Sequence, residues 1–308
     1  MIIDMHSHLW REDMPSTSWW DSFVKVSASL SGRPEEKIRQ KLPGWMDGTG
    51  DLIIKDMDEA GIDKSVLLPI DYVIGSGTGE AASLDEQHTM YAKAVEKYPD
   101  RLITFAGVDP RRPEAPRFLE NAVKKWNVKG LKLHPCVGFY PNETCCYRLY
   151  EKCLELGLVV TVHTGPEVYP WYSKYALPIY LDEVANDFPD LPLIICHAGE
   201  CYWEEAAMIT SNKLNLFVDI SWWQTVYLNF SKKEFYQRLR NLMNIAGTSR
   251  VLFGSDWPAM RQVRSLNHAA WTNVINDAPK LAAEVGVNFK QEEIDKVMSG
   301  NAVKLLGL

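Results

Sequence analysis

The sequence predicts an α/β fold, a closed (β/α)8 TIM barrel of eight parallel strands ringed by helices. Short apolar runs rich in β-branched residues recur along the 308 residues, and segments with apolar residues three and four positions apart lie between them. Such alternation is typical of a parallel sheet covered by helices, and eight repeats favour closure into a barrel. The expected strands are residues 2–8, 64–70, 102–109, 128–134, 158–164, 191–198, 214–221 and 250–256.

The segments between the strands carry the helical pattern. The clearest are residues 51–62, 84–99, 115–127, 145–157 and 233–247, and a further helix is expected from residue 291 to the end. A doubly wound open sheet is the structural alternative, but it calls for a glycine-rich phosphate loop after an early strand. The glycines at 75–80 open no such helix, so we interpret them as a loop.

The connection after the first strand, residues 10–50, is longer than an ordinary βα loop. It contains Trp19, Trp20, Phe23 and Trp45, and a helix is expected around 34–41. Long insertions at the catalytic rim of a barrel often cover the site, so we expect a lid within a single domain spanning 1–308. A second extended region runs from 257 to 290.

Composition excludes several classes of protein. The chain has 33 Lys and Arg against 40 Asp and Glu, a formal net charge of −7, and these charges are interleaved, so we expect no nucleic-acid partner. No run approaches the roughly 18 apolar residues of a membrane span, so no membrane partner is expected. The chain opens on a strand-like run rather than a cationic, apolar leader, and none of its six cysteines forms a CxxC pair. We therefore expect a cytoplasmic protein with reduced thiols.

His6 and His8 are the first indication of chemistry. Residues two apart on a strand project to the same side, so both imidazoles are expected to point toward one place. Histidine is the commonest metal ligand among side chains. Taken alone, the pair is equally compatible with a metal site and with one buried histidine beside a chance neighbour.

Further ionisable residues stand where other predicted strands end. They are His134, His163, His197 and Asp256, whereas His88 and His268 fall in helices or loops and are expected to be solvated or to cap a helix. The carboxyl ends of barrel strands form the active site in such folds. On this barrel His6, His8, His163 and Asp256 would open onto one cavity, and they would offer three nitrogen donors and one carboxylate to a divalent ion.

Six motifs in this order resemble one known family over essentially the whole chain. They are DMHSHLW at the start, GLKLHP at 130–135, VHTG at 162–165, CHAGE at 196–200, FGSDWP at 253–258 and the ending GNAVKLLGL. The set is similar to the amidohydrolase-related (amidohydrolase 2) branch of the amidohydrolase superfamily, which includes aminocarboxymuconate semialdehyde decarboxylase-like enzymes. The resemblance implies that His6, His8, His163 and Asp256 hold the metal and that His197 is the acid/base or carbonyl-polarising residue. It also implies zinc, with manganese as the competitor, and a homodimer.

The chemistry of these residue types agrees with that allocation. Three or four protein ligands leave a coordination position open, where the pKa of a bound water falls to about 7. The second oxygen of Asp256 can accept a proton from that water, and His197 can stabilise charge on the substrate. Asp4 is expected to point inward below His6, either as acceptor for a ligand N–H or as a strand-end carboxylate held by backbone.

Lys132 shares the inward face of its strand with His134 and has three interpretations. It could be carboxylated and bridge two metals, with His163 and His197 on the second ion, as in binuclear members of the superfamily. It could contact a substrate carboxylate, or it could form a salt bridge, for which Asp4 is a candidate. We favour one metal, with Lys132 and His134 as polar groups of the substrate site.

Aromatic residues follow the catalytic strands closely, and Trp171 and Trp257 are the predicted substrate contacts among them. Of the nearby cations Arg11, Lys174, Arg261 and Arg264, we predict Arg11 as a carboxylate-binding residue. The sequence therefore favours a metal-dependent hydrolase that acts on a small aromatic or unsaturated carboxylic acid, lactone or amide through metal-activated water. The alternative is a metal-dependent non-oxidative decarboxylase using the same residues, and a catalytically silent barrel is the third hypothesis.

Overall fold

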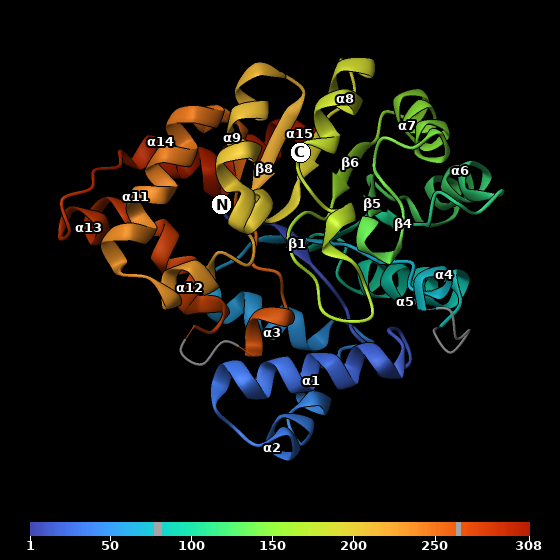
Figure 1. Cartoon of the computed structure of the whole chain (residues 1–308), viewed down its shortest axis with the longest axis horizontal. Helices are drawn as coiled ribbons and strands as arrows, with labels where there is room; N and C mark the ends of the chain where they lie inside the picture. Colours follow the sequence, from blue (N-terminus) through green and yellow to red (C-terminus); the bar gives the residue numbers. More distant parts are fainter. Residues whose placement is uncertain (77–81, 263–265) are drawn as a thin grey trace.

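Each of the eight predicted runs forms a strand in the computed structural model, which describes residues 1–76, 82–262 and 266–308. The third run is split at Phe105, so the described chain has nine strands (Figure 1). They are β1 (Ile3–Ser7), β2 (Lys64–Leu67), β3 (Leu102–Thr104), β4 (Ala106–Gly107), β5 (Gly130–Leu133), β6 (Val159–Val162), β7 (Leu193–Ile195), β8 (Leu216–Asp219) and β9 (Val251–Leu252). The predicted (β/α)8 barrel is confirmed.

Hydrogen bonds close the strands into a ring. The parallel ladders run in the orders β1-β2-β3 and β4-β5-β6-β7-β8-β9. The amide of Met5 donates to the carbonyl of Phe253 at 2.9 Å, and that of Asp256 donates to His6 at 2.8 Å, which joins the last strand to the first. The amide of Phe105 donates to Leu67 at 3.0 Å and continues the ring across the split. The carboxyl ends of all strands therefore surround one opening.

The five clearest helical predictions correspond to α3 (Asp51–Ala60), α5 (Leu84–Lys97), α6 (Ala115–Trp126), α7 (Thr144–Leu156) and α11 (Lys232–Leu242). The other helices around the barrel are α4 (Val73–Ser76), α8 (Tyr180–Asp187), α9 (Trp203–Asn212), α10 (Gln224–Asn229), α12 (His268–Asn276) and α13 (Ala278–Ala283). The C-terminal helix is α14 (Gln291–Asp295) and α15 (Asn301–Leu306), joined by a π-helical turn. Among the described helices, none combines the length and apolar character needed to cross a membrane.

Residues 10–50 form α1 (Thr17–Ser31), α2 (Glu35–Arg39) and a 3-10 turn, η1 (Leu42–Trp45), beside the barrel in Figure 1. The predicted helix at 34–41 is α2. The sequence analysis missed α1, although Ser16 caps it by accepting from the Trp19 amide and Gly32 ends it in the left-handed conformation. Its aromatic residues surround Trp10, whose ring lies 5.6–5.8 Å from those of Trp19, Trp20 and Phe23.

Strand β1 is irregular, and this irregularity corrects the prediction for Asp4. The pairing of β1 with β2 shifts register between Asp4 and Ser7. Met5 therefore joins the apolar cluster inside the barrel, with Val159 of β6, while Asp4 faces outward. The Asp4 carboxylate accepts from Ser7 Oγ at 2.9 Å and from the Ser255 amide at 2.9 Å. It is a structural carboxylate and not a partner of a ligand imidazole.

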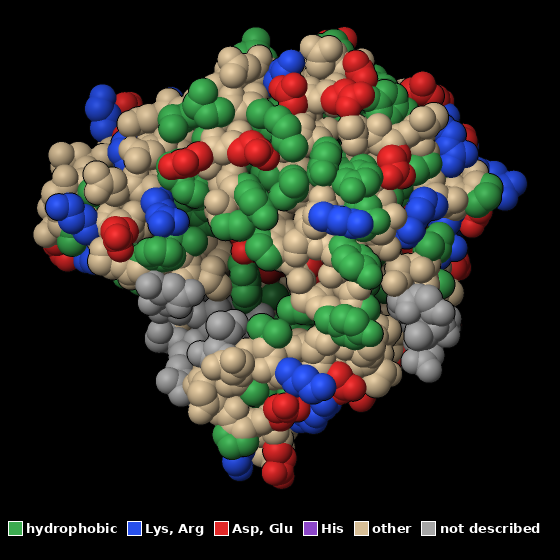
Figure 2. Space-filling view, in the orientation of Figure 1, with side chains coloured by type: hydrophobic (Ala, Val, Ile, Leu, Met, Phe, Trp, Pro, Cys, Tyr) green, Lys and Arg blue, Asp and Glu red, His purple; other side chains and the backbone are tan. Residues whose placement is uncertain are grey.

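The surface drawn in Figure 2 mixes both signs of charge. Lys and Arg side chains are interspersed with Asp and Glu on this face, and hydrophobic side chains gather toward its middle.

Candidate active site

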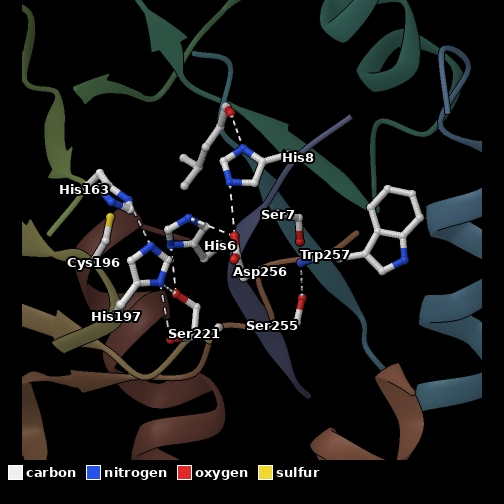
Figure 3. A network of polar contacts seen from close by, with 12 residues as sticks. His6, Ser7, His8, His163, Cys196, His197, Ser221, Ser255, Asp256 and Trp257 are labelled. Atoms are coloured by element: carbon white, nitrogen blue, oxygen red, sulfur yellow. Dashed lines mark hydrogen bonds and ion pairs between the residues drawn. The ribbon is translucent and has the colours of Figure 1, made fainter. Parts of the chain in front are cut away.

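His6 and His8 meet Asp256 at the carboxyl ends of β1 and β9 (Figure 3). Asp256 Oδ1 lies 3.2 Å from His8 Nε2 and 3.6 Å from His6 Nε2. One ligand atom from each residue lies within 4.8 Å of the other two, and all three residues are buried. Asp256 adopts a left-handed backbone conformation, with φ of 58°, in the turn that brings its carboxylate over β1.

Hydrogen bonds to Nδ1 on the far side of each ring direct Nε2 toward Asp256. His8 Nδ1 donates to the Leu68 carbonyl at 2.7 Å, because a carbonyl can only accept. His6 Nδ1 contacts Asp219 Oδ2 at 3.1 Å. Burial raises the pKa of Asp219, but its contacts with His6 and Ser221 outweigh this and hold it below the usual range as a carboxylate. Two imidazole nitrogens and one carboxylate oxygen facing one another fit a divalent cation such as zinc or manganese.

His163 and His197 lie beside this group and contact each other. His197 Nε2 is 3.2 Å from His163 Nδ1, and the His197 ring centroid is 4.7 Å from that of His6. On its other side, His197 Nδ1 lies 2.8 Å from Ser221 Oγ and 3.3 Å from the Ser221 carbonyl. His163 stands outside the 4.8 Å group of His6, His8 and Asp256. Its role as a fourth ligand therefore stays a prediction.

A turn with an unusual backbone follows β7 and positions His197. Four consecutive residues have positive φ, namely His197 at 57°, Ala198 at 43°, Gly199 at 74° and Glu200 at 50°. A side chain on Gly199 would place its Cβ 2.8 Å from Pro178, so glycine is required there. Left-handed conformations at non-glycine residues are costly and cluster at functional sites. This turn brings both His197 and Glu200 to the lining of the cavity.

The cavity above the histidines has a volume of about 290 Å³. Its polar lining includes His8, Lys132, His134, His163, Glu167, His197, Glu200 and Asp256. Its apolar lining includes Trp10, Trp19, Phe23, Ile70, Tyr72 and Trp171. The Trp171 ring stacks on Tyr72 with centroids 5.5 Å apart and planes 15° apart. Such a chamber suits a small, flat molecule with oxygen substituents at one end.

The family model described as "Amidohydrolase" matches residues 3–308, nearly the whole chain. This chain belongs to the amidohydrolase family. It is thus a metal-dependent enzyme of the amidohydrolase superfamily, which confirms the resemblance drawn from its motifs. No curated protein matches it.

Solved structures similar to this amidohydrolase share its fold at low identity. A TIM-barrel protein from Bordetella bronchiseptica is 19% identical, with TM-score 0.69 over 99% of this chain and 98% of the other. A dihydroxybenzoic acid decarboxylase from Polaromonas sp. JS666, with bound manganese and 2-nitroresorcinol, is 18% identical, with TM-score 0.70 over 100% and 97%. A probable 2-pyrone-4,6-dicarboxylic acid hydrolase from Acinetobacter baumannii is 16% identical, with TM-score 0.66 over 100% and 99%.

Lys132 of the amidohydrolase is buried in the cavity wall. Its Nζ lies 3.1 Å from Cys196 Sγ and 3.4 Å from His6 Nε2. The suggested salt bridge to Asp4 is wrong, because the shifted register of β1 turns that carboxylate to the outside of the barrel. Lys132 therefore remains a polar group of the site, together with His134 and Trp171, which also line the cavity.

Two predicted substrate contacts lie elsewhere and are corrected. Arg11 is bound to Asp13, with Nε 2.9 Å from Oδ1, and is absent from the described lining of the cavity. Trp257 is fully buried, and its indole N–H donates to Asp56 at 2.8 Å. In Figure 3 its ring points away from the histidines. Neither position could be excluded from sequence, because nearness along the chain does not give the direction of a side chain.

The other Lys and Arg residues considered as substrate contacts either contact other side chains or lie outside the residues that the structure describes. Arg261 donates to Asp56 at 3.1 Å, and Lys174 lies over the ring of Tyr175 at 4.8 Å. Arg264 and the glycine-containing segment 77–81 lie outside the described residues.

Two histidines expected to be solvated or capping are buried instead. His268 Nε2 lies 3.2 Å from Asp4 Oδ2. His88 Nδ1 donates to the Leu84 carbonyl at 2.7 Å, and its Nε2 accepts from the Gly107 amide at 2.9 Å. The prediction was wrong because both helices carry these rings on the face that packs against the barrel.

Sequence reasoning missed three acidic residues of the site. Asp219, at the end of β8, contacts His6, and its place at the end of a predicted strand was the available signal. Glu167 Oε2 lies 3.3 Å from His134 Nε2, and no local motif marked it. Glu200 ends the CHAGE motif, and burial, with help from Glu167 and Asp256, raises its pKa to about 8.

Proposed function

We propose that this enzyme removes the carboxyl group of a small aromatic acid without oxidation, as a metal-dependent decarboxylase. One observation carries the choice: Glu200 places a carboxyl group with a pKa raised to about 8 on the wall of the cavity. A carboxyl group with that pKa is largely protonated at neutral pH. It is therefore a proton source beside the predicted metal ligands, and replacing a carboxyl group on a ring carbon requires a proton.

Each residue then has a defined task. A divalent ion held by His6, His8 and Asp256 would supply Lewis-acid binding of the substrate's oxygen atoms. Glu200 donates its proton to the ring carbon, and the electron pair of the breaking C–C bond restores the ring as carbon dioxide leaves. His197, oriented by Ser221 through a 2.8 Å contact, donates or accepts a hydrogen bond as charge shifts on the substrate.

The cavity and the insertion favour an aromatic acid. The stacked pair of Tyr72 and Trp171 forms a flat wall, and Trp19 and Phe23 of α1 close the cavity from the side of residues 10–50. We propose that this insertion acts as the lid, which excludes water while the carbon is protonated. The dihydroxybenzoic acid decarboxylase of the same fold, with its bound manganese, supports this substrate class and makes manganese a candidate beside zinc.

Hydrolysis by metal-activated water, which we predicted first from the sequence, remains the second candidate. The Asp256 carboxylate favours it, because contacts with His8, His6 and His197 outweigh burial and keep its pKa below the usual range. It is thus an available proton acceptor for water. The probable hydrolase from Acinetobacter baumannii, which has the same fold, supports this second candidate.

The test uses the full chain, stripped with a chelator and reloaded with manganese or zinc. Dihydroxybenzoic acids are offered in one set of assays, and pyrone lactones and amides in the other, with carbon dioxide and ring-opened product both measured. We expect metal-dependent carbon dioxide release, with deuterium entering the ring in heavy water. Glu200→Gln should lose it, and Glu155→Gln, on the exposed face of α7, should retain it. Ring opening without carbon dioxide would establish the hydrolase instead.

A further inference from the structure

We propose that Asp4 is a positioning residue whose carboxylate fixes the two chain segments that carry the predicted metal ligands. One segment is β1, with His6 and His8, and the other is the turn after β9, with Asp256. Asp4 faces α12, outside the ring of strands, and is absent from the described lining of the cavity. The inference rests on the metal centre of the proposed function, but it does not depend on which reaction that centre performs.

The buried Asp4 carboxylate is surrounded by hydrogen-bond donors. Its Oδ1 accepts from the amides of His6 at 3.1 Å and Ser255 at 2.9 Å. Its Oδ2 accepts from the hydroxyls of Ser7 at 2.9 Å and Ser255 at 2.5 Å, and from His268 Nε2 at 3.2 Å. A carboxylate only accepts, so each of these groups is the donor.

The partners of Asp4 within the barrel carry or adjoin the predicted metal ligands. Ser7 separates His6 from His8, and Ser255 precedes Asp256. Each oxygen of the carboxylate accepts once from β1 and once from the turn after β9. One side chain therefore holds both segments at the same time, and its loss would let their ligands move relative to one another.

Both segments depart from regular strand geometry, so the strand ladder alone does not define them. The register of β1 against β2 shifts between Asp4 and Ser7, and the backbone of Asp256 is left-handed, with φ of 58°. The segments also pack closely, because a Cβ on Gly254 would lie 3.0 Å from His6 Cβ. Such backbone conformations persist only where their surroundings hold them. Asp4 supplies this support on both sides of the junction.

His268 links the Asp4 carboxylate to α12. It is the first residue of that helix and is buried, and its Nε2 donates to Asp4. The Asn267 side chain caps the same helix end by accepting from the Ala270 amide at 2.8 Å. Helix α12 in turn packs against α3. Asp4 and His268 therefore connect the two ligand-bearing segments to the outer ring of helices.

Metal affinity of the full chain tests the proposal without an activity assay. The manganese Kd is measured by competition with a chelating indicator, and the absorption spectrum of the cobalt(II)-loaded protein reports the geometry of the ligands. In Asp4→Ala we expect a manganese Kd weaker by about tenfold or more, and a changed cobalt spectrum. A carboxylate that only stabilised the fold would lower the free energy of unfolding and leave both readouts unchanged.

Asp4→Asn is the conservative variant that should rescue the centre. Its oxygen can still accept from the amides of His6 and Ser255, which cannot turn. The hydroxyls of Ser7 and Ser255 can rotate to accept from its nitrogen, and His268 can take its other tautomer. We therefore expect a manganese Kd within about threefold of the wild type, less than the loss of a supporting group causes.

Asp47→Ala is the matched control. Asp47 is a buried carboxylate that accepts from the amides of Gly50 at 2.8 Å and Ile53 at 3.0 Å, and it is absent from the described lining of the cavity. Its loss should lower the free energy of unfolding but leave the manganese Kd and the cobalt spectrum unchanged. Circular dichroism verifies that each variant is folded.

Two results would overturn the positioning role alone: an unchanged Kd and spectrum in folded Asp4→Ala, or an equal change in Asp47→Ala. A wild type that binds neither manganese nor cobalt would overturn the metal centre as well, and with it the proposed function. If Asp4→Ala does not fold, His268→Leu and His268→Gln decide, because glutamine keeps an N–H donor for Asp4. Weaker metal binding in His268→Leu that His268→Gln restores would support the proposal, and equal Kd values in the two variants would overturn it.

Discussion

Asp219→Asn tests whether the hydrogen bonds behind His6 prepare it to bind a metal together with His8 and Asp256. Asp219 Oδ2 contacts His6 Nδ1 at 3.1 Å, while Oδ1 accepts from the amides of His197 at 3.1 Å and Ser221 at 3.0 Å. Asparagine has the same shape but replaces one oxygen with an amide nitrogen that only donates. The substitution thus changes hydrogen bonding with little change in volume.

The expected loss of metal affinity depends on which of two orientations the asparagine side-chain amide adopts. With its oxygen toward the two backbone amides, its nitrogen donates to His6 Nδ1 and moves the imidazole proton to Nε2, where it blocks metal binding. The flipped amide keeps the bond to His6 but leaves two buried N–H groups unpaired, at about 1–3 kcal/mol each. The first arrangement costs less. Loss of such a supporting group weakens metal affinity about 10–100-fold, or roughly 1.4–2.8 kcal/mol.

The assay is competition of the protein with a chelating indicator for manganese and for zinc. The matched control is Asp71→Asn, a buried carboxylate that pairs with Arg112 at 2.6 Å and is absent from the described cavity lining. It should lower stability and leave the metal Kd unchanged. A metal Kd for Asp219→Asn within twofold of the wild type, or an equal change in the control, would refute the role of Asp219.

Three further outcomes are expected. His197→Asn should keep its metal content but lower kcat about 10²–10⁴-fold, and unchanged turnover in the metal-loaded variant would contradict its role. In the wild type, the rate should fall as pH rises through the pKa of Glu200, which burial raises to about 8, because deprotonation removes the proton donor. Because this pKa is raised in the folded state, stability of the metal-free protein should also decline as pH rises toward 8, and Glu200→Gln should remove both effects. Phe23→Ala should lower the free energy of unfolding by about 3–5 kcal/mol, measured with denaturant, because it opens a cavity in the aromatic cluster of α1. The same variant should raise KM, and an unchanged KM would count against the lid.

The barrel was predictable because its signals are local. Apolar runs of β-branched residues and helices of period 3.6 can be recognised within a few turns of chain, and all eight strands were placed from them. The meeting of His6, His8 and Asp256 was predictable for a related reason. Parallel strands in a closed barrel bring their carboxyl ends to one opening, however far apart they lie in the sequence.

The errors concern the directions of side chains, which neither strand alternation nor nearness along the chain determines. Strict alternation along β1 placed Asp4 inside the barrel, but one register shift against β2 turned it outward, to His268 of α12. Arg11 follows the first strand closely, yet its ion pair with Asp13 holds it away from the cavity. The register shift depends on β2, about 60 residues further along the chain, and the sequence pattern of β1 does not record it. The ion pair of Arg11 is local, but nearness to the first strand alone did not reveal it.

By itself, the sequence determined the strand order, the positions of the histidines at strand ends and the family to which the chain belongs. Tertiary structure alone decided which imidazole nitrogens face Asp256, since that depends on the Leu68 carbonyl and Asp219 behind His8 and His6. It also decided the state of Glu200, whose raised pKa comes from burial and from neighbouring carboxylates. Protonation states depend on solvent exclusion and on charges a few ångströms away, and these exist only once the barrel has closed.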